Sequence, residues 1–307
     1  MMSLVRDSGR RLYAQPYLLL TLTPLIWALN AVAGRALVGE VSPMVTTILR
    51  WGLVIIILGI IARRQIVAER YLLARHWRFI LVMGAVGFTG FNAPLYLGAA
   101  TTTAVNIGMI QGVMPALVLA GSFLAYRTPF TPLQVCGLLV AVLGVGVVVS
   151  HGEIQQLKAL QIREGDLWIL FACVLYAGYT VALRRRPPIS AFAFFAGLSV
   201  AAFLSTIPLV GLEIMAGTIR WPGPKGWAIL VMLAIGPSLI SQIFYMRGVE
   251  LIGPGRAGLF VNLVPVFAAI LAVLLLSEEF AAYHAVALGL VLAGIALAEI
   301  GKPRSPA

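Results

Sequence analysis

Long apolar runs, separated by short polar segments, follow one another along almost the whole chain. The runs are continuous and do not alternate between apolar and polar residues, which favours helices over the strands of a membrane barrel. A helix needs about 20 apolar residues to cross the hydrocarbon core of a bilayer. The pattern predicts ten such spans, at residues 17–37, 43–62, 78–98, 102–126, 131–150, 166–184, 190–212, 226–247, 256–277 and 282–300.

The composition strengthens this prediction. Of the 307 residues, 61% are hydrophobic and 11% are charged, whereas a soluble domain holds about 25% charged residues. We therefore expect an all-α integral membrane protein. The first run is longer and more polar inside than the apolar core of a signal peptide, and no small-residue cleavage site follows it, so we interpret it as a span.

The distribution of basic residues predicts the orientation. If the N-terminus is cytoplasmic, 16 of the 22 Lys and Arg residues fall in cytoplasmic segments and four in the opposite segments. The positive-inside rule then places both termini in the cytoplasm. The outer loops carry acidic residues, among them Glu40, Asp166 and Glu278. This arrangement accounts for the net charge of +11, so we expect no nucleic-acid partner, and the short loops favour a bacterial inner membrane.

The chain also resembles itself after a shift of 150 residues, which places Trp77 on Trp227, Gly98 on Gly248 and Pro115 on Pro265. Each half holds five predicted spans, so the second half starts on the opposite side of the membrane. A 5+5 inverted-topology repeat is a recurrent plan of secondary transporters. The predicted organisation is a cytoplasmic tail (1–16), a first five-helix repeat (17–150), an extracytoplasmic linker (151–165), a second repeat (166–300) and a cytoplasmic tail (301–307).

Several short motifs occur in a telling order: W-x-x-N at 27–30, ILRW at 48–51, GMIQGVMP at 108–115, GLFVNLVP at 258–265 and SEEF at 277–280. Together they resemble the EamA-type transporters of the drug/metabolite transporter superfamily. The resemblance implies a ten-helix, exporter-like fold with a central cavity between the halves. Members of that superfamily move amino acids, drugs, nucleotide sugars and other metabolites, so the fold alone does not name the cargo.

Polar and aromatic side chains inside the predicted spans are the candidate cargo-binding residues. An amide that faces lipid leaves its polar groups unmet, which is unfavourable. Such a side chain therefore either bonds a neighbouring helix or faces a watered cavity, and the sequence leaves both alternatives open. The candidates are Trp27, Asn30, Asn92, Tyr96, Gln111, Tyr176, Tyr179, Gln242, Tyr245 and Asn262.

Two further groups accompany them. Gly108 and Pro115 in one span, with Gly258 and Pro265 at the same offsets in another, are predicted hinge positions, because proline frees a backbone carbonyl and glycine permits close approach. Arg50 lies inside a span, where a charge is unfavourable without a partner. It is a candidate contact for an anion. It could instead reach the outer interface or bind backbone carbonyls.

These features predict a secondary transporter, an exporter of small metabolites such as amino acids, that works by alternating access. No Asp or Glu lies in the middle of a predicted span, so neutral or zwitterionic cargo is favoured over cationic drugs. The G-x-x-x-x-G-K-[ST] motif for ATP is absent from the sequence, and we expect no cofactor. A coupling proton and a monomeric or dimeric state stay open.

Two other classes of protein are alternatives: a passive pore or facilitator, and an intramembrane enzyme. An enzyme needs paired carboxylates, a metal cluster or an activated nucleophile, and the spans contain no such group. The histidines lie near helix ends without metal-ligand spacing, at positions 76, 151 and 284. Cys136 and Cys173 lie inside apolar runs and are interpreted as core residues.

Overall fold

The protein is helical throughout the part of the chain that the computed structural model describes, which is residues 14–127, 131–152, 163–252, 257 and 260–301. None of these residues forms a strand. Eight helices are long and apolar enough to cross a membrane, and two shorter apolar helices follow them. The all-helical prediction is therefore confirmed for the described residues.

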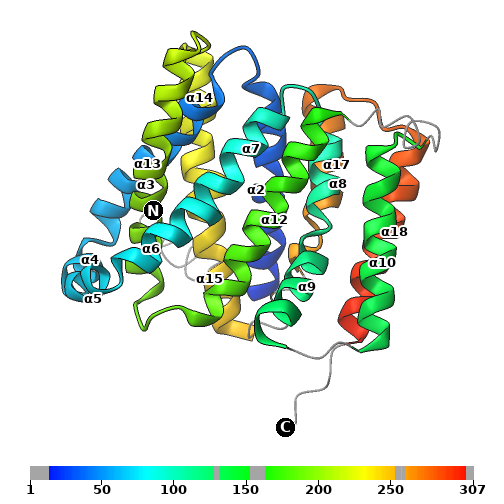
Figure 1. Ribbon diagram of the computed structural model, residues 1–307, viewed down its shortest axis with the longest axis horizontal. Helices are drawn as coiled ribbons and strands as arrows, with labels where there is room; N and C mark the ends of the chain where they lie inside the picture. Colours follow the sequence, from blue (N-terminus) through cyan, green and yellow to red (C-terminus); the bar gives the residue numbers. More distant parts are fainter. Residues whose placement is uncertain (1–13, 128–130, 153–162, 253–256, 258–259, 302–307) are drawn as a thin grey trace, which may run out of the picture.

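The helices are arranged as a bundle with its long axes roughly parallel (Figure 1). In chain order they are α2 (Pro16–Ala36), α3 (Pro43–Ile61), α4 (Arg63–Ala68), α5 (Arg70–Arg75), α6 (Trp77–Gly84), the π-helical η1 (Ala85–Thr89), α7 (Gly90–Gly98), α8 (Ala104–Gln111), α9 (Met114–Tyr126), α10 (Pro132–Val149), α12 (Glu164–Ala182), the 3-10 turn η2 (Leu183–Arg185), α13 (Ala191–Met215), α14 (Pro224–Leu233), the π-helical η3 (Ala234–Ile240), α15 (Ser241–Ile252), α17 (Val264–Leu276) and α18 (Ala282–Ile300).

Local sequence explains where many of these helices begin. Proline stands at the first helical residue of α2, α3, α10 and α14, where its missing N–H leaves no bond unmade. Thr131 forms a capping box with Gln134 at the start of α10, and the Thr103 side chain accepts a hydrogen bond from the Asn106 N–H at the start of α8. Such caps satisfy N–H groups that a helix leaves free at its first turn.

Irregular backbone recurs at the same places in the two halves. The π-helical segment η1 is followed about 150 residues later by η3. Helices α9 and α17 are offset by 150 residues at both ends, and each ends at a residue with left-handed backbone, Arg127 with φ 55° and Ser277 with φ 52°. The predicted span 102–126 is divided between α8 and α9, because Pro115 favours the start of a new helix.

The two halves pack through corresponding elements. Helix α2 contacts α15 and α17, just as α12 contacts α7 and α9. Arg35 at the end of α2 donates to the carbonyls of Ala99 and Ala100, and Gly165 at the start of α12 lies against the carbonyl of Gly98. The end of α2 and the start of α12 therefore lie at the same end of the bundle, so the two helices run in opposite directions (Figure 1).

Helices α10 and α18 form a close pair at one edge of the bundle (Figure 1). The pair depends on glycine: a Cβ added to Gly137 would lie 2.5 Å from the Gly294 carbonyl oxygen. Small residues allow such close approach, which is how helices associate inside a bilayer.

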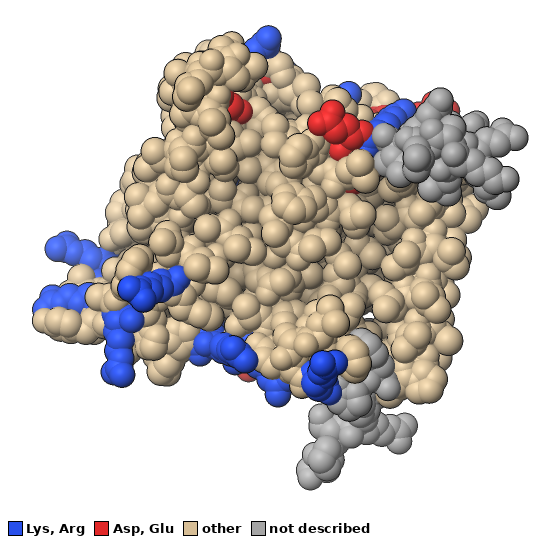
Figure 2. Space-filling model, viewed as in Figure 1, with Lys and Arg blue, Asp and Glu red and all other residues tan. Residues whose placement is uncertain are grey.

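On the face shown in Figure 2, charged side chains gather toward the ends of the bundle, and the surface between them is largely uncharged. Large apolar residues cover the sides: Leu124 and Leu274, which are 150 residues apart, are 73% and 71% exposed. We call the end that carries Arg63, Arg64, Arg70 and Arg184–Arg186 the Arg-rich end, and the other, with Glu40, Glu213 and Glu278, the acidic end.

Carboxylates tie the halves together at helix starts. Glu213 in α13 accepts from the Ser42 hydroxyl at 2.7 Å and from the Met44 N–H at 3.0 Å, at the start of α3. Glu278 accepts from the Ala104 and Val105 N–H groups of α8 at 2.9 and 3.0 Å. A carboxylate at a helix start satisfies free N–H groups and the positive end of the helix dipole. These contacts therefore stabilise the acidic end.

Candidate functional site

The most polar group buried among the helices surrounds Arg50. Its side chain is only 5% exposed. Nη1 donates to Asn30 Oδ1 at 2.6 Å, to Asn92 Oδ1 at 2.7 Å and to the Tyr96 hydroxyl at 2.6 Å, and Nε donates to Ser238 Oγ at 2.7 Å. We refer to these five residues as the Arg50 cluster. Both alternatives considered for Arg50, reaching the interface or binding backbone carbonyls, are wrong in this structure.

Four elements supply the cluster. Asn30 comes from α2, Arg50 from α3, Asn92 and Tyr96 from successive turns of α7, and Ser238 from η3. The acceptors are held in place by further bonds. The Asn92 side-chain amide donates to the Phe88 carbonyl at 2.8 Å.

The remaining three acceptors are also anchored. The Tyr96 hydroxyl donates to Asn30 Oδ1 at 3.2 Å, and the Ser238 hydroxyl donates to the Leu233 carbonyl, five residues back, at 3.0 Å. That longer reach suits the π-helical turn in which Ser238 lies. The guanidinium is thus enclosed by oxygens that are already oriented toward it.

All of these acceptors are neutral. Among the described residues the ion pairs are Lys225–Glu40 and Arg247–Glu250, and neither involves Arg50. Neutral oxygens solvate the guanidinium but leave its positive charge uncompensated. A buried charge without a counter-charge attracts an anion strongly, because the surroundings screen it poorly.

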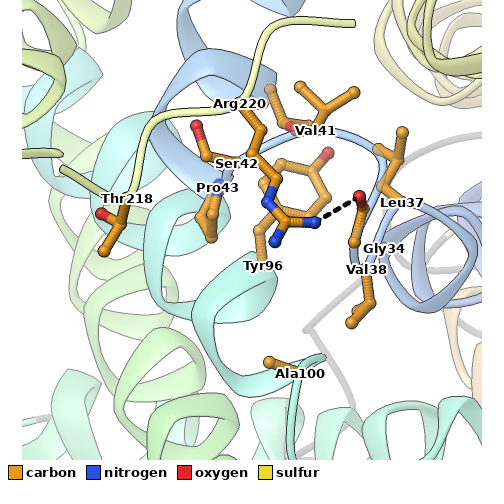
Figure 3. Close-up of a pocket in the computed structure, with 12 residues that line it drawn as sticks. Gly34, Leu37, Val38, Val41, Ser42, Pro43, Tyr96, Ala100, Thr218 and Arg220 are labelled. Carbon is orange, nitrogen blue, oxygen red and sulfur yellow. Dashed lines mark hydrogen bonds between the residues drawn. The ribbon is translucent and has the colours of Figure 1, made fainter. Parts of the chain in front are cut away.

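A cavity of about 250 Å³ reaches the Arg50 cluster from the acidic end. Tyr96 lines this cavity together with Gly34, Ser42, Thr46 and Arg220 (Figure 3). The backbone of Gly34 lies close to Tyr96, since a Cβ added to Gly34 would come within 3.3 Å of the tyrosine ring. Tyr96 therefore separates the cavity from the guanidinium that its hydroxyl contacts.

Aromatic side chains form a second group of candidates. The rings of Trp27 and Tyr245 lie 5.5 Å apart between α2 and α15, and those of Tyr176 and Tyr179 lie 5.4 Å apart along α12. Tyr176 also contacts Phe91, with ring centroids 5.0 Å apart. The ring centroids of these pairs lie within the range of separations that interacting aromatic side chains show.

A chain of ring contacts joins this group to the Arg50 cluster. Tyr179 contacts Phe88 at 5.7 Å, and Phe88 stacks on Trp51 at 4.5 Å, beside Arg50 in sequence. Phe88 also supplies the carbonyl that holds Asn92. The predicted aromatic and amide residues of α2, α7 and α12 are thus brought into one connected region.

Three predicted amides are not part of it. Gln111, Gln242 and Asn262 are half-buried and have no hydrogen-bond partner among the described residues. Gln242 lies 150 residues after Asn92, but the two amides differ in their contacts: in the second half Ser238, one turn before Gln242, bonds Arg50 instead. Of the predicted hinge residues, Pro115 and Pro265 stand near the starts of α9 and α17.

The remaining hinge candidates are the two glycines. Gly108 packs against Ala268 of α17, and Gly258 lies outside the described residues. Sequence reasoning missed Ser238, whose residue type is common in membrane helices and gives no signal alone. It also treated Arg50 apart from the amide candidates, whereas Asn30 and Asn92 gather around this cation.

Comparison with known proteins identifies the relatives of this chain. The EamA-like transporter family matches residues 15–150 and again residues 163–299. The uncharacterized transporter YyaM of Bacillus subtilis is 28% identical over 234 residues, which are 75% of each chain. An uncharacterized transporter of Archaeoglobus fulgidus is 24% identical over 294 residues, covering 92% of this chain and 97% of the relative.

A solved crystal structure has the same fold, with a TM-score of 0.63 at 21% identity, over 94% of this chain and 98% of the other. The two successive family matches agree with the corresponding helix breaks and contacts of the two halves. Eight long apolar helices, apolar sides and transporter relatives make this a multi-pass membrane transporter. The chain belongs to the EamA-like transporter family.

Proposed function

We propose that this protein is a secondary transporter that exports small carboxylate-bearing metabolites, with zwitterionic amino acids as the cargo class. The observation that carries the proposal is the Arg50 cluster, a buried guanidinium whose described partners are all neutral oxygens. A cargo carboxylate would supply the counter-charge that the protein leaves out. Charge-assisted hydrogen bonds between a guanidinium and a carboxylate are among the stronger polar contacts in proteins.

The route to Arg50 supports this class of cargo. The cavity at the acidic end stops at Tyr96, whose hydroxyl is bonded to both Arg50 and Asn30. Rotation of this side chain would expose Nη1 to the cavity. The apolar part of an amino acid would then lie toward aromatic surfaces, for which Trp27 with Tyr245 and Tyr176 with Tyr179 are the candidates.

We propose that the irregular segments of the bundle allow helices to bend during alternating access. In the proposed arrangement ten helices form a 5+5 inverted repeat, with both termini cytoplasmic in a bacterial inner membrane. The paired irregularities, η1 with η3 and the starts of α9 and α17, are where helices can bend. Gly108, Pro115 and Pro265 then act as hinge positions, because they interrupt helix packing or backbone bonding there.

Counterflow in proteoliposomes tests this proposal. Vesicles loaded with unlabelled leucine should take up radiolabelled leucine, or another zwitterionic amino acid of a panel, in a saturable way. The methyl ester of the same amino acid, which keeps the ammonium group but lacks the carboxylate, should compete at least about 30-fold less well, since breaking a buried charge contact removes about 2 kcal/mol or more.

Variants of Arg50 make the test specific. Arg50→Gln should lose saturable counterflow, and Arg50→Lys, which keeps the charge but not the fork of donors, should retain part of it. Arg185→Gln is the matched control, because Arg185 is exposed at the Arg-rich end. Equal competition by acid and ester, or full counterflow in Arg50→Gln, would refute a carboxylate site. Linear flux that does not saturate would identify a pore instead.

A further inference from the structure

A second buried polar group lies at the acidic end, where α12 begins. Asp166 is in the first turn of α12 and is 0% exposed. Its Oδ1 accepts from the Thr102 hydroxyl and, at 3.4 Å, from the Asn106 side-chain amide. Its Oδ2 is buried and has no hydrogen-bond partner among the described residues. The interpretation of Asp166 as an outer-loop acid is therefore wrong.

His284 of α18 contacts Asn106 of this group, and its two hydrogen bonds define its tautomer. Its Nδ1 accepts from the Ala281 N–H at 3.0 Å, so Nδ1 carries no proton. Its Nε2 lies 3.1 Å from Asn106 Oδ1 and must donate to that oxygen. Asn106 consequently turns its amide nitrogen toward Asp166. His284 is thus a neutral structural residue that orients Asn106 and takes no part in exchanging protons.

His151, directly after α10, has the opposite character. Both of its ring nitrogens are buried, and neither has a hydrogen-bond partner in the described part of the chain. Its ring lies against Tyr283, with centroids 5.9 Å apart, and Tyr283 lies 4.0 Å from His284. His151 is within electrostatic range of both Asp166 and His284. His151 therefore adjoins, through the Tyr283 ring, the group formed by His284, Asn106 and Asp166.

The other charged groups around Asp166 and His151 lie near the surface. Arg163, just before α12, interacts with Asp166 and Tyr283, and Glu279 interacts with Tyr283. Both are exposed. Glu278 is occupied by the start of α8. The described residues also contain no cluster of His, Cys, Asp and Glu that could hold a metal ion.

We propose that Asp166 binds the proton that couples transport to the proton gradient, on the carboxylate oxygen Oδ2 that has no described partner. The protonated group is a neutral carboxylic acid. Release of the proton to water leaves a carboxylate, so the site changes by one charge. A buried uncompensated carboxylate is unfavourable, so release requires that water reach Asp166. The coupling role rests on the proposed transport function, and proton binding itself does not.

Contacts between neighbouring helices connect Asp166 to the Arg50 cluster. A Cβ added to Gly165 would lie 2.5 Å from the Gly98 carbonyl oxygen and 2.6 Å from the Thr101 hydroxyl. The start of α12 therefore packs closely against the turn between α7 and α8. Asp166 also accepts a hydrogen bond from Thr102 in this turn. Helix α7 carries Asn92 and Tyr96. Opening around Asp166 would move the end of α7 and thereby the two acceptors that hold Arg50.

Infrared titration of the purified protein tests proton binding without any cargo. A protonated carboxyl group in a buried site should give a carboxylic-acid band that disappears as the pH rises. Asp166→Asn should lack this band, and Glu164→Gln, which removes an exposed carboxylate two residues earlier, should keep it. An unchanged band in Asp166→Asn would overturn the assignment. If Asp166→Asn does not fold, Thr102→Val, which removes the hydroxyl that donates to Asp166 Oδ1, should make the band disappear at a higher pH, because that bond favours the carboxylate; no change would equally overturn the assignment.

Transport tests the coupling. An imposed pH gradient should drive accumulation of labelled leucine by the parent protein and by Glu164→Gln. Asp166→Asn should keep counterflow at equal pH but lose the response to the gradient, which a merely structural residue would not do. An intact response would refute coupling through Asp166. Absence of counterflow in the parent would refute the proposed cargo, whereas the infrared result would still decide whether Asp166 binds a proton.

Discussion

The Arg50 cluster and the carboxylates of the acidic end both hold a charge inside the protein, but they satisfy it with different kinds of partner. Arg50 is a buried cation bonded by neutral side chains of α2, α3, α7 and η3. Glu213 and Glu278 are anions bonded largely by backbone N–H groups at the starts of α3 and α8. Helix starts provide free donors and a positive dipole end, so an anion there needs no basic side chain. Inside the bundle, the described partners of Arg50 are all side chains.

The difference separates structural charges from charges that are open to a ligand. Both Glu278 oxygens have their donors, and the carboxylate fixes two helices to each other. The neutral partners of Arg50 hold the guanidinium in place without cancelling its charge. A carboxylate such as Glu278 in place of Asn30 would pair with Arg50 and remove its attraction for an anion. The absence of an acidic partner for Arg50 among the described residues is therefore what the proposed anion binding requires.

The largest effect on stability is expected at Asn92. Asn92→Leu removes an acceptor of Arg50 and the bond to the Phe88 carbonyl, so it should lower the free energy of unfolding by about 2–3 kcal/mol. Chemical or thermal unfolding in detergent measures this. The control is Gln242→Leu at the corresponding position 150 residues later, half-buried and without a hydrogen-bond partner in the described chain. It should change stability by less than about 0.5 kcal/mol. Equal losses would mean that the halves use these amides alike.

A smaller effect is expected at the acidic end. Glu278→Gln keeps one acceptor oxygen but loses the negative charge and one of the two bonds to α8. We expect a loss of about 1–2 kcal/mol, the range of helix-cap and dipole contacts. Glu279→Gln removes the exposed neighbouring carboxylate and should have little effect. Should both variants melt at the parental temperature, the contact between Glu278 and α8 would not contribute to stability.

Much of the fold was predictable from the chain because lipid imposes simple rules. Continuous apolar runs, arginine-rich segments and the 150-residue shift anticipated the helices, the charged ends and the paired positions of Pro115 and Pro265. These features depend on neighbouring residues or on composition, which a sequence displays directly. The π-helical turns at η1 and η3 were not anticipated, because they depend on how distant helices pack.

The site was predictable only in part. Asn30, Asn92 and Tyr96 were recognised as polar residues out of place in lipid, but nothing in the sequence tells which of several amides converge. Convergence on Arg50 depends on the register of α2, α3 and α7. The same limit explains Asp166: its place at a predicted span boundary is typical of an exposed cap, and the sequence does not show that Thr102 and Asn106 at the start of α8 come to lie against it in a buried site.

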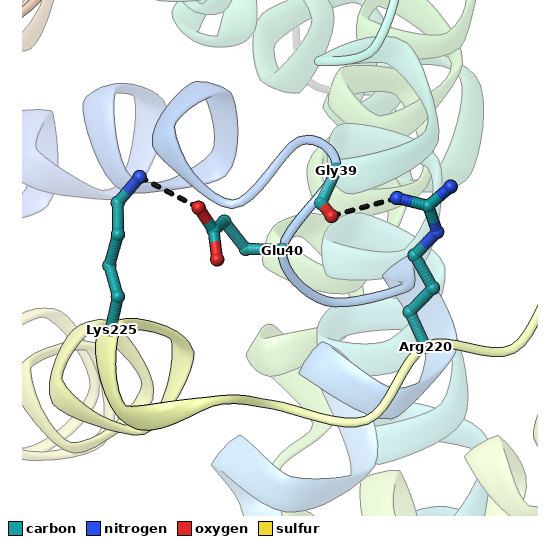
Figure 4. A network of polar contacts seen from close by, with 4 residues as sticks. All are labelled: Gly39, Glu40, Arg220 and Lys225. Carbon is teal, nitrogen blue, oxygen red and sulfur yellow. Dashed lines mark hydrogen bonds and ion pairs between the residues drawn. The ribbon is translucent and has the colours of Figure 1, made fainter.

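The smallest effect is expected where a carboxylate meets a basic side chain at the surface. Lys225 Nζ lies 2.9 Å from Glu40 Oε1, next to the bond from Arg220 to the Gly39 carbonyl (Figure 4). The two side chains are 65% and 36% exposed, so water and salt screen them and their ordering opposes the attraction. Lys225→Ala should lower the free energy of unfolding by at most about 0.5 kcal/mol, and added salt should abolish the difference. Melting curves of parent and variant at low and high salt measure both quantities. A loss above about 1 kcal/mol that persists in high salt would mean that this pair acts as a clamp like Glu278, and that burial does not separate structural from superficial charges at the acidic end.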